Sequence, residues 1–250
     1  QEELSKIATE RGMIAWYPDY LALELTDALS NFVGVDANKI LTCPGSDVGL
    51  ETLCRTYLNP DDTVVAICPT YENFFVYAQQ TGAELVKLTL DAPFTVSERQ
   101  LVNDLSDAGS FKMVYLASPN NPCGYTLPLQ AIKSVADSFP NSLIVIDEAY
   151  VEFSDSGSAA LLVDEHSNVV VMRTFSKAFG MAGLRLGYLC APLEVINNVN
   201  KIRNGKNVSM IAQRLGLRAL KDFHHIESWI HRVVASRSQF EDWCASQGLV

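Results

Sequence analysis

The sequence predicts an α/β fold with a mainly parallel central sheet that carries helices on both faces. Segments 63–68, 112–117 and 168–172 each contain a continuous apolar run of strand length, and segments with helical spacing of apolar residues alternate with them. Strands that are apolar throughout are typical of parallel sheets buried on both faces. With 250 residues, 48% of them hydrophobic and 19% charged, the chain is long enough for one such domain, or for one domain and part of a second.

The first half of the chain begins with a polar lead-in that includes Pro18, a residue that breaks helices. Apolar residues then recur at helical spacing over 21–32, and Gly34 is predicted to end that helix. We expect Pro69-Thr-Tyr71 to open another helix, which Gly82 ends. The helix that begins there is predicted over 71–80. The predicted strands of this half are 39–43, 63–68 and 84–88, and its other predicted helices are 47–58 and 98–105.

The second half continues the alternation of strands and helices. Its predicted strands are 112–117, 142–146, 168–172 and 186–189, and its predicted helices are 129–138, 193–202 and a long tract from about 209 to 246. In sheets of this kind a site lies outside the carboxyl ends of the strands, and the polar loops of the chain fall there.

The composition excludes several classes of function. A net charge of −10 argues against binding to nucleic acid or to an anionic membrane, since both require basic patches. The six cysteines form no C-x-x-C pair, which predicts reduced thiols, and His224, His225 and His231 lack ligand partners, so no metal site is predicted. No signal peptide or membrane span is expected. These features favour a cytoplasmic protein with a small-molecule partner.

A lysine with an anion-binding neighbourhood follows the last long apolar run. Lys177 comes directly after Ser176, and Arg185 stands eight residues later. A lysine beside hydroxyls and an arginine suits a Schiff-base lysine whose cofactor carries both a carbonyl and a phosphate, and pyridoxal 5′-phosphate (PLP) is that cofactor. An ordinary strand-end loop gives the same short pattern.

Pro44-Gly-Ser-Asp47 runs from a predicted strand into a predicted helix. Gly45 lets the backbone come close to a ligand, while Ser46 and Asp47 present N–H groups at the positive end of the helix. The segment therefore predicts a phosphate seat, although a plain helix cap explains the same residues.

Asp147 ends an apolar strand, where an unpaired charge is costly. A protonated pyridine nitrogen would be a suitable partner, and the pairing would keep the ring cationic. Tyr150 can reach the phenolic oxygen of the same ring, and the amide of Asn121 can donate to it. Tyr71 can stack on the ring. The structural alternative for Asn121 is a role in a turn, and the structural alternative for Tyr71 is packing.

Taken in order, the motifs GSD, PTY, NNPxG, DEAY and TFSKAFGMAGLRLGY resemble those of fold-type I PLP-dependent aminotransferases, and look most like the histidinol-phosphate aminotransferase group. The match extends from Tyr17 to about residue 210. The resemblance implies an N-terminal segment at 1–35, a PLP-binding large domain at 36–208, and a helical tract at 209–250 that leads into a truncated small domain.

The resemblance also implies roles for individual residues. Lys177, Asp147 and Tyr71 would be catalytic: Lys177 would carry the cofactor, Asp147 would pair with its pyridine nitrogen, and Tyr71 would stack on the ring. The phenolic oxygen would be held by Asn121 and Tyr150. The phosphate would be held by Ser46, Asp47, Thr174, Ser176 and Arg185.

In this family the tyrosine of the YPD segment reaches the neighbouring subunit's site, so Tyr17 implies a homodimer. Cys123 stands where the family usually has threonine, a change at a turn that we expect to be tolerated. The small domain, with its carboxylate-binding arginine, is expected to be missing after Val250, and no arginine between 203 and 237 stands in a matching motif.

The implied activity is transamination between histidinol phosphate, or an amino acid, and 2-oxoglutarate, as in histidine biosynthesis. Alternatives within the same group are an aromatic or other α-amino-acid aminotransferase and a PLP-dependent decarboxylase. A PLP-binding protein without turnover is the alternative from another class, although the basic helix-turn-helix expected of a regulator is not evident in the sequence.

Overall fold

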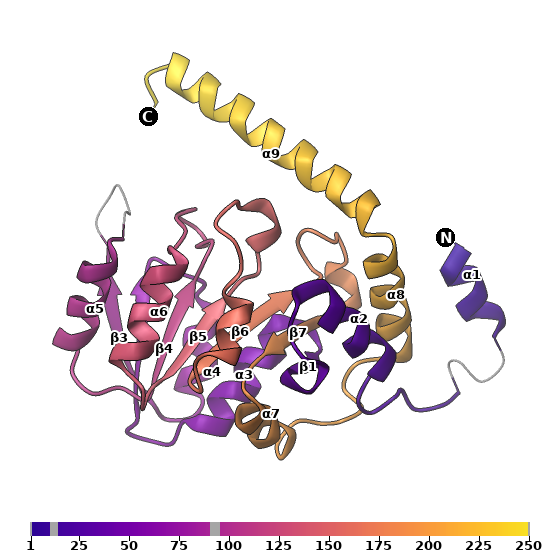
Figure 1. Cartoon of the computed structure of the whole chain (residues 1–250), viewed down its shortest axis with the longest axis horizontal. Helices are drawn as coiled ribbons and strands as arrows, with labels where there is room; N and C mark the ends of the chain where they lie inside the picture. The colour runs from indigo at the N-terminus through magenta and orange to yellow at the C-terminus, as the bar shows by residue number, and fades with distance from the viewer. Residues whose placement is uncertain (1, 11–14, 91–95, 250) are drawn as a thin grey trace.

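The residues described by this computed structural model, 2–10, 15–90 and 96–249, include a seven-stranded sheet (Figure 1). The strand order is β1-β7-β6-β5-β4-β2-β3. Every neighbouring pair is parallel except those formed by β7, which is antiparallel to both β6 and β1. The prediction of a mainly parallel sheet is thus confirmed. The strands are β1 (Ile40–Cys43), β2 (Thr63–Cys68), β3 (Glu84–Thr89), β4 (Met113–Ala117), β5 (Leu143–Asp147), β6 (Val169–Thr174) and β7 (Gly187–Cys190).

Helices cover both faces of the sheet, because alternate residues of each central strand feed two separate hydrophobic cores. In β2, for example, Val64 and Ala66 belong to one core, and Val65 and Ile67 to the other. The first core is covered by α3 (Gly45–Tyr57), α4 (Asn73–Gln79) and α7 (Leu193–Asn200). The second is covered by α2 (Leu23–Val33), α5 (Glu98–Asp107), α6 (Leu129–Ser138) and α8 (Met210–Lys221).

Local signals fix the ends of several helices. Gly34 adopts a left-handed conformation that ends α2, as expected, and its N–H donates to the Ser30 carbonyl oxygen. The side chains of Ser97 and Ser209 cap the amino ends of α5 and α8. Single-turn 3-10 helices occur at η1 (Ala37–Lys39), η2 (Val151–Phe153) and η4 (Ala182–Leu184), and a longer one at η3 (Ala159–Asp164).

The structure corrects the sequence prediction at both ends of the chain. The polar lead-in contains the helix α1 (Glu2–Thr9), which is held to α8 by burial of Ile7 and by a 3.2 Å ion pair between Glu3 and Arg214. The long C-terminal tract is two helices, α8 and α9 (Phe223–Ser246), because the chain turns at Asp222. The Asp222 N–H still donates to the Arg218 and Ala219 carbonyls, while its backbone leaves the helical conformation.

A further correction concerns Tyr71, which was expected at the start of a helix. Pro69-Thr-Tyr71 forms the loop between β2 and α4 instead, since α4 begins at Asn73. This loop keeps Tyr71 at the carboxyl edge of the sheet.

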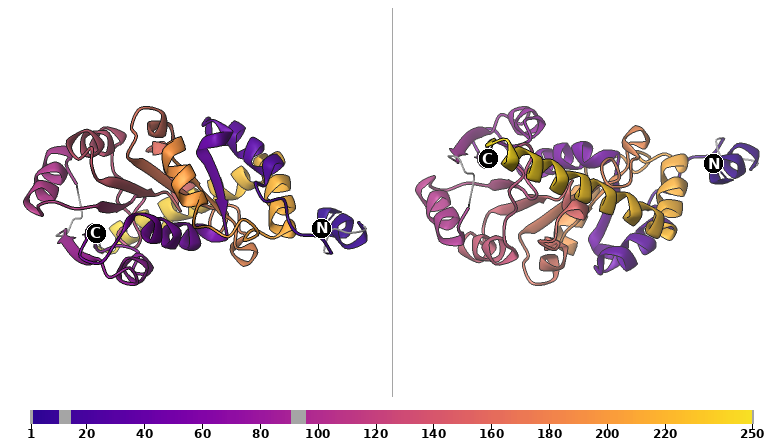
Figure 2. Two further views of the ribbon diagram at one scale, coloured as in Figure 1. Left: turned by 90° about the horizontal axis from the view of Figure 1, so that it is seen from below. Right: turned by 90° about the horizontal axis from the view of Figure 1, so that it is seen from above.

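The carboxyl edge of the sheet is where the polar motifs meet. Because β7 is antiparallel, the loop 175–186 leaves β6 and enters β7 at this same edge. The helix α9 crosses above the edge (Figures 1 and 2) and contacts η2, where the Arg237 guanidinium donates to the Phe153 carbonyl oxygen at 3.2 Å. Trp229, Phe240 and Trp243 of α9 are exposed.

The division of the chain at residues 35 and 208 stays a prediction. The helices α2, before residue 35, and α8, after residue 208, both contribute to the second core. Among the described residues, no helix is long and apolar enough to span a membrane. The same part of the chain has no cluster of three or more potential metal ligands.

Candidate active site

A cavity of about 150 Å³ opens at the carboxyl edge of the sheet, among β4, β5, β6 and the amino end of α3. It is lined by all the residues that the sequence predicts to bind the cofactor, namely Ser46, Asp47, Tyr71, Asn121, Asp147, Tyr150, Thr174, Ser176, Lys177 and Arg185. Tyr115 and Pro119 also line it. Side chains that are up to 139 positions apart along the chain therefore face one small volume.

One side of the cavity is the start of α3, where backbone N–H groups have no side-chain cap among the described residues. Gly45 has a positive φ of 78°, and a β-carbon at this position would overlap the guanidinium of Arg185. Gly187 of β7 lies directly behind, where a β-carbon would come within 2.7 Å of Gly45 C and Ser46 N. These two glycines allow the start of α3, Arg185 and β7 to pack closely together.

We expect Gly187→Ala to push the start of α3 away from β7, because the atoms that it would meet are backbone atoms. The free energy of unfolding should fall by roughly 1–3 kcal/mol, as for overpacked cores, and PLP should bind more weakly. Gly183→Ala is the matched control, since no described atom lies within 4 Å of the added carbon. Urea unfolding and PLP titration measure both effects, and equal stability of the two variants would contradict the expectation.

Arg185 and the hydroxyl groups of Thr174 and Ser176 line the same cavity as the start of α3. The Arg185 guanidinium donates to Asp47 Oδ2 at 3.0 Å and to the Ala182 carbonyl oxygen at 3.2 Å. Its backbone is left-handed, with a φ of 50°, a conformation that costs energy in a residue with a side chain. The Thr174 hydroxyl bonds to the Ser176 hydroxyl at 3.0 Å and accepts the Ser176 N–H. The carboxylate of Asp47 thus orients the arginine before any ligand binds.

Lys177 lies three residues beyond the end of β6 and is exposed. Its Nζ is 5.1 Å from the centroid of the Tyr150 ring, within the range of a cation–π contact. Asn121 lines the same cavity, whereas the side chain of its neighbour Asn120 bonds to the Pro69 carbonyl oxygen and accepts the Cys123 N–H. The hydrogen bond in this turn involves the backbone N–H of Cys123 and not its side chain. This is consistent with the expectation that a cysteine is tolerated there.

Asp147 is buried at the end of β5, with a partner for each oxygen. The Tyr115 hydroxyl donates to Oδ2 at 2.6 Å, and the Ala149 N–H donates to Oδ1 at 3.0 Å. Burial raises the pKa of Asp147, while these two hydrogen bonds act to lower it. Sequence reasoning missed Tyr115, which lies in the middle of an apolar strand.

Tyr71 donates its hydroxyl to Asp47 Oδ1 at 2.8 Å and accepts from Asn73 Nδ2 at 2.9 Å. Burial, together with the bond to Asp47, raises the pKa of Tyr71 to about 12, so the phenol is neutral at physiological pH. Asp47 consequently joins Tyr71 to Arg185 through its two carboxylate oxygens.

A buried charge cluster lies under the loop that follows Asp147. Arg173 of β6 donates to Glu152 Oε1 at 2.8 Å, and its Nε is 3.8 Å from Glu148 Oε2. Glu148 also accepts the Ser158 hydroxyl at 2.6 Å and the Ala159 N–H at 2.5 Å. Burial raises the pKa of both glutamates, and Arg173 acts to lower both. One arginine therefore holds two carboxyl groups of the Tyr150 loop against the sheet.

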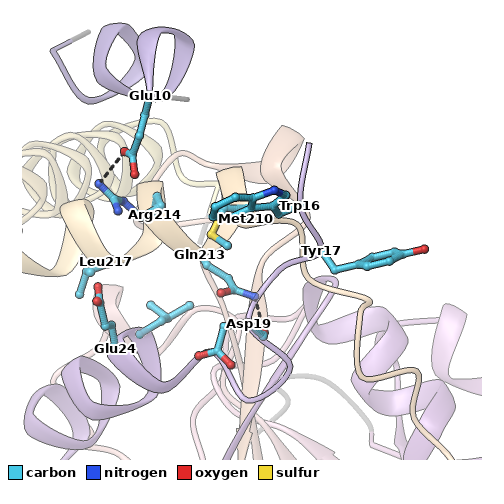
Figure 3. Close-up of a pocket in the computed structure, with 10 residues that line it drawn as sticks. Glu10, Trp16, Tyr17, Asp19, Glu24, Met210, Gln213, Arg214 and Leu217 are labelled. Atoms are coloured by element: carbon cyan, nitrogen blue, oxygen red, sulfur yellow. Dashed lines mark hydrogen bonds and ion pairs between the residues drawn. The ribbon is translucent and has the colours of Figure 1, made fainter. Parts of the chain in front are cut away.

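Tyr17 does not line the cavity at the carboxyl edge of the sheet. It lies 76% exposed at a larger hollow of about 310 Å³ between the N-terminal segment and α8 (Figure 3). Its ring points away from Arg214 in that view, and Lys206 Nζ lies 4.1 Å from the ring centroid. This hollow contains none of the residues that the sequence predicts for cofactor binding.

Comparison with known proteins places the chain in a family. The sequence model of aminotransferase class I and II matches residues 1–246. A dihydroxyacetone phosphate transaminase of Campylobacter jejuni is 34% identical over 92% of this chain and 62% of that protein. A histidinol-phosphate aminotransferase of Methanococcoides burtonii is 35% identical over 94% of this chain and 64% of that protein. The chain thus spans less than two thirds of the length of these relatives.

A solved structure gives the same result for the fold. Histidinol-phosphate aminotransferase from Sinorhizobium meliloti, in complex with pyridoxal-5′-phosphate, matches with a TM-score of 0.88 and 27% identity. The match covers 98% of this chain and 67% of that chain. The resemblance of the five motifs to PLP-dependent aminotransferases is confirmed, and the chain belongs to the aminotransferase class I and II family.

Proposed function

We propose that this chain provides the cofactor site and the catalytic lysine of a PLP-dependent aminotransferase. The observation that carries the proposal is the meeting of Lys177, the buried carboxylate of Asp147 and an uncapped helix end in one cavity. Family membership and the PLP complex of the Sinorhizobium meliloti relative support the choice of cofactor.

The residues present fit the chemical groups of PLP. An anionic phosphate suits the free N–H groups of α3 together with Arg185, Ser176 and Thr174. A cationic ring nitrogen suits Asp147, whose carboxylate is otherwise a buried charge without a cation in hydrogen-bond contact among the described residues. Asn121 and Tyr150 are available for the phenolic oxygen, and Tyr71 for the face of the ring.

When bound, PLP supplies an electron sink next to the bond that is broken. The chain's own residues then have separate tasks. The Lys177 amine would remove the proton from the donor's α-carbon as a general base, and its protonated form would then donate a proton as a general acid. Asp147 would stabilise a positive charge on the ring nitrogen, and Arg185 would help to hold the phosphate and so to position the cofactor.

The substrate is proposed from the relatives. Those named above are called after histidinol phosphate and dihydroxyacetone phosphate, two compounds that share a phosphate group. Histidinol phosphate as donor with 2-oxoglutarate as acceptor, in histidine biosynthesis, is the first proposal. Use of dihydroxyacetone phosphate as acceptor is the second, because the Campylobacter jejuni relative, at 34% identity, is about as similar to this chain as the Methanococcoides burtonii relative, at 35%. We also propose a cytoplasmic homodimer in which Tyr17 reaches the partner's site.

A panel of donors and acceptors tests the proposed function. We expect conversion of 2-oxoglutarate to glutamate with histidinol phosphate as donor, with aromatic amino acids as slower donors. Glutamate with dihydroxyacetone phosphate tests the second substrate, and release of CO₂ would identify a decarboxylase. PLP binding without turnover of any donor, in a form that includes the full length of the relatives, would overturn the proposal in favour of a binding protein.

A further inference from the structure

Tyr115 is a fully buried tyrosine whose hydroxyl bonds to the buried carboxylate of the candidate site. The strand register explains how the two residues meet. Ala117 of β4 pairs with Asp147 of β5, and Tyr115 stands two residues before Ala117, on the same face of the sheet. A diagonal neighbour of this kind is within reach of an aromatic side chain. The pairing of the two strands therefore places the Tyr115 hydroxyl 2.6 Å from Asp147 Oδ2.

The ring of Tyr115 is fixed independently of its hydroxyl. It stacks on Phe74 of α4 with a centroid distance of 4.1 Å and an interplanar angle of 11°. Burial raises the pKa of Tyr115 well above its usual value, so the group is a permanent hydrogen-bond donor at physiological pH. A phenol with a locked ring and a permanent proton is suited to hold one oxygen of a carboxylate in place.

We propose that Tyr115 is a positioning residue for Asp147: its hydroxyl holds Oδ2, favours the anionic carboxylate and keeps it turned to the cavity for a cationic ring nitrogen. The inference rests on the proposed function and adds a residue to it. With Oδ1 held by the Ala149 N–H, both oxygens have a fixed donor while the group still lines the cavity.

Other charged groups act on Asp147 from the elements around it. Asp47 of α3 acts to raise the pKa of Asp147, and Lys177, beyond β6, acts to lower it. Among the causes, burial is the largest and raises the pKa, and the Tyr115 hydrogen bond is the largest of those that lower it. Without the Tyr115 hydroxyl, less remains to offset the effect of burial on the pKa of Asp147. That pKa therefore rises, and protonation of Asp147 begins at a higher pH.

The chain offers a matched control for this substitution. Tyr188 of β7 is as deeply buried as Tyr115, but its hydroxyl has no hydrogen-bond partner among the described residues. Tyr188 contributes to the opposite core and does not line the cavity. Tyr115→Phe and Tyr188→Phe therefore remove the same atom from equally buried rings, and only the first removes a bond to Asp147.

The test is the pH dependence of PLP binding to protein from which the cofactor has been removed. Wild type should lose affinity as the pH falls and Asp147 takes up a proton. In Tyr115→Phe the fall should begin about one pH unit higher, which is a roughly tenfold weaker affinity in the affected range. Tyr188→Phe should follow wild type. Superimposable profiles for wild type and Tyr115→Phe, or equal shifts in both variants, would overturn the proposal.

A second measurement uses the protein without added cofactor, so it stands even if the proposed function fails. Infrared spectroscopy detects the C=O stretch of a protonated carboxyl, and the band that is absent in Asp147→Asn belongs to Asp147. That band should appear at a higher pH in Tyr115→Phe than in wild type. An unchanged titration would refute the role of Tyr115, whereas absence of PLP binding in every variant, with the band shifted as expected, would refute only the cofactor site.

Discussion

Lys177→Ala is expected to lower the transamination rate by about a thousandfold or more, since a positioned acid–base group contributes 10²–10⁴. The variant should still bind PLP through Asp147, Arg185 and the start of α3, because none of these contacts uses the lysine. In wild type, reduction with borohydride followed by peptide mapping should place the pyridoxyl group on Lys177. In Lys177→Ala the label should disappear while the fold, measured by circular dichroism, is unchanged.

Lys87→Ala is the control for this prediction. Lys87 is exposed on β3, where its Nζ lies 4.3 Å from the centroid of the Phe75 ring, and it does not line the cofactor cavity. It should keep both labelling and rate. A pyridoxyl group found on Lys87, or on any lysine other than Lys177, would contradict the assignment of Lys177 as the lysine that carries the cofactor.

Arg173→Met is expected to lower the free energy of unfolding by about 3–5 kcal/mol at pH 8, the usual cost of removing one partner of a buried ion pair. The methionine fills most of the volume but leaves Glu148 and Glu152 buried without their cation. Because these glutamates hold the loop that carries Tyr150, weaker PLP binding should accompany the loss of stability.

The pH dependence of this deficit has a definite sign. The folded-state pKa of each glutamate is already raised from its ordinary value of 4.5 by burial, and loss of Arg173 raises it further. A raised carboxyl pKa contributes stability that is fully present below the unfolded pKa and is lost as the pH rises through the folded pKa. The deficit of Arg173→Met should therefore be larger at pH 8 than at pH 5.

Urea unfolding of wild type and variant at the two pH values measures the difference. Arg55→Met is the control, because Arg55 forms a 3.8 Å surface pair with Glu51 on α3 and is 58% exposed. Its effect should stay within about 0.5 kcal/mol at both pH values. A deficit for Arg173→Met that is the same at pH 5 and pH 8 would show that packing, and not charge, is what the arginine provides.

The sheet and the cavity lining were predictable because they depend on simple patterns. Buried parallel strands are apolar throughout, and a polar residue such as Asp147 at the end of one falls at the carboxyl edge. Tyr115 was not predicted, since an aromatic residue inside an apolar strand looks like core. Its role depends on the pairing of Ala117 with Asp147, and sequence patterns do not supply this register.

Three other differences have separate physical reasons. The helix α1 is short, and it is stabilised by Ile7 and Arg214, from opposite ends of the chain. The turn at Asp222 contains neither proline nor glycine, so local sequence does not mark it. Proline is a frequent first residue of helices, so the sequence predicts a helix that opens at Pro69. In the structure Pro69 belongs to the loop that carries Tyr71, and α4 begins at Asn73.

The direction of β7 has a consequence for how the site can vary. A parallel strand after β6 would need a crossover, and the chain would then return from the opposite edge of the sheet. Since β7 runs the other way, Lys177 and Arg185 stay on a single loop whose two ends are anchored to neighbouring strands. The distance between the Lys177 amine and the Arg185 guanidinium thus depends on the length of the loop 175–186. Insertions between residues 177 and 185 should alter the reach from lysine to phosphate, while insertions after β7, at the far edge of the sheet, should leave it unchanged.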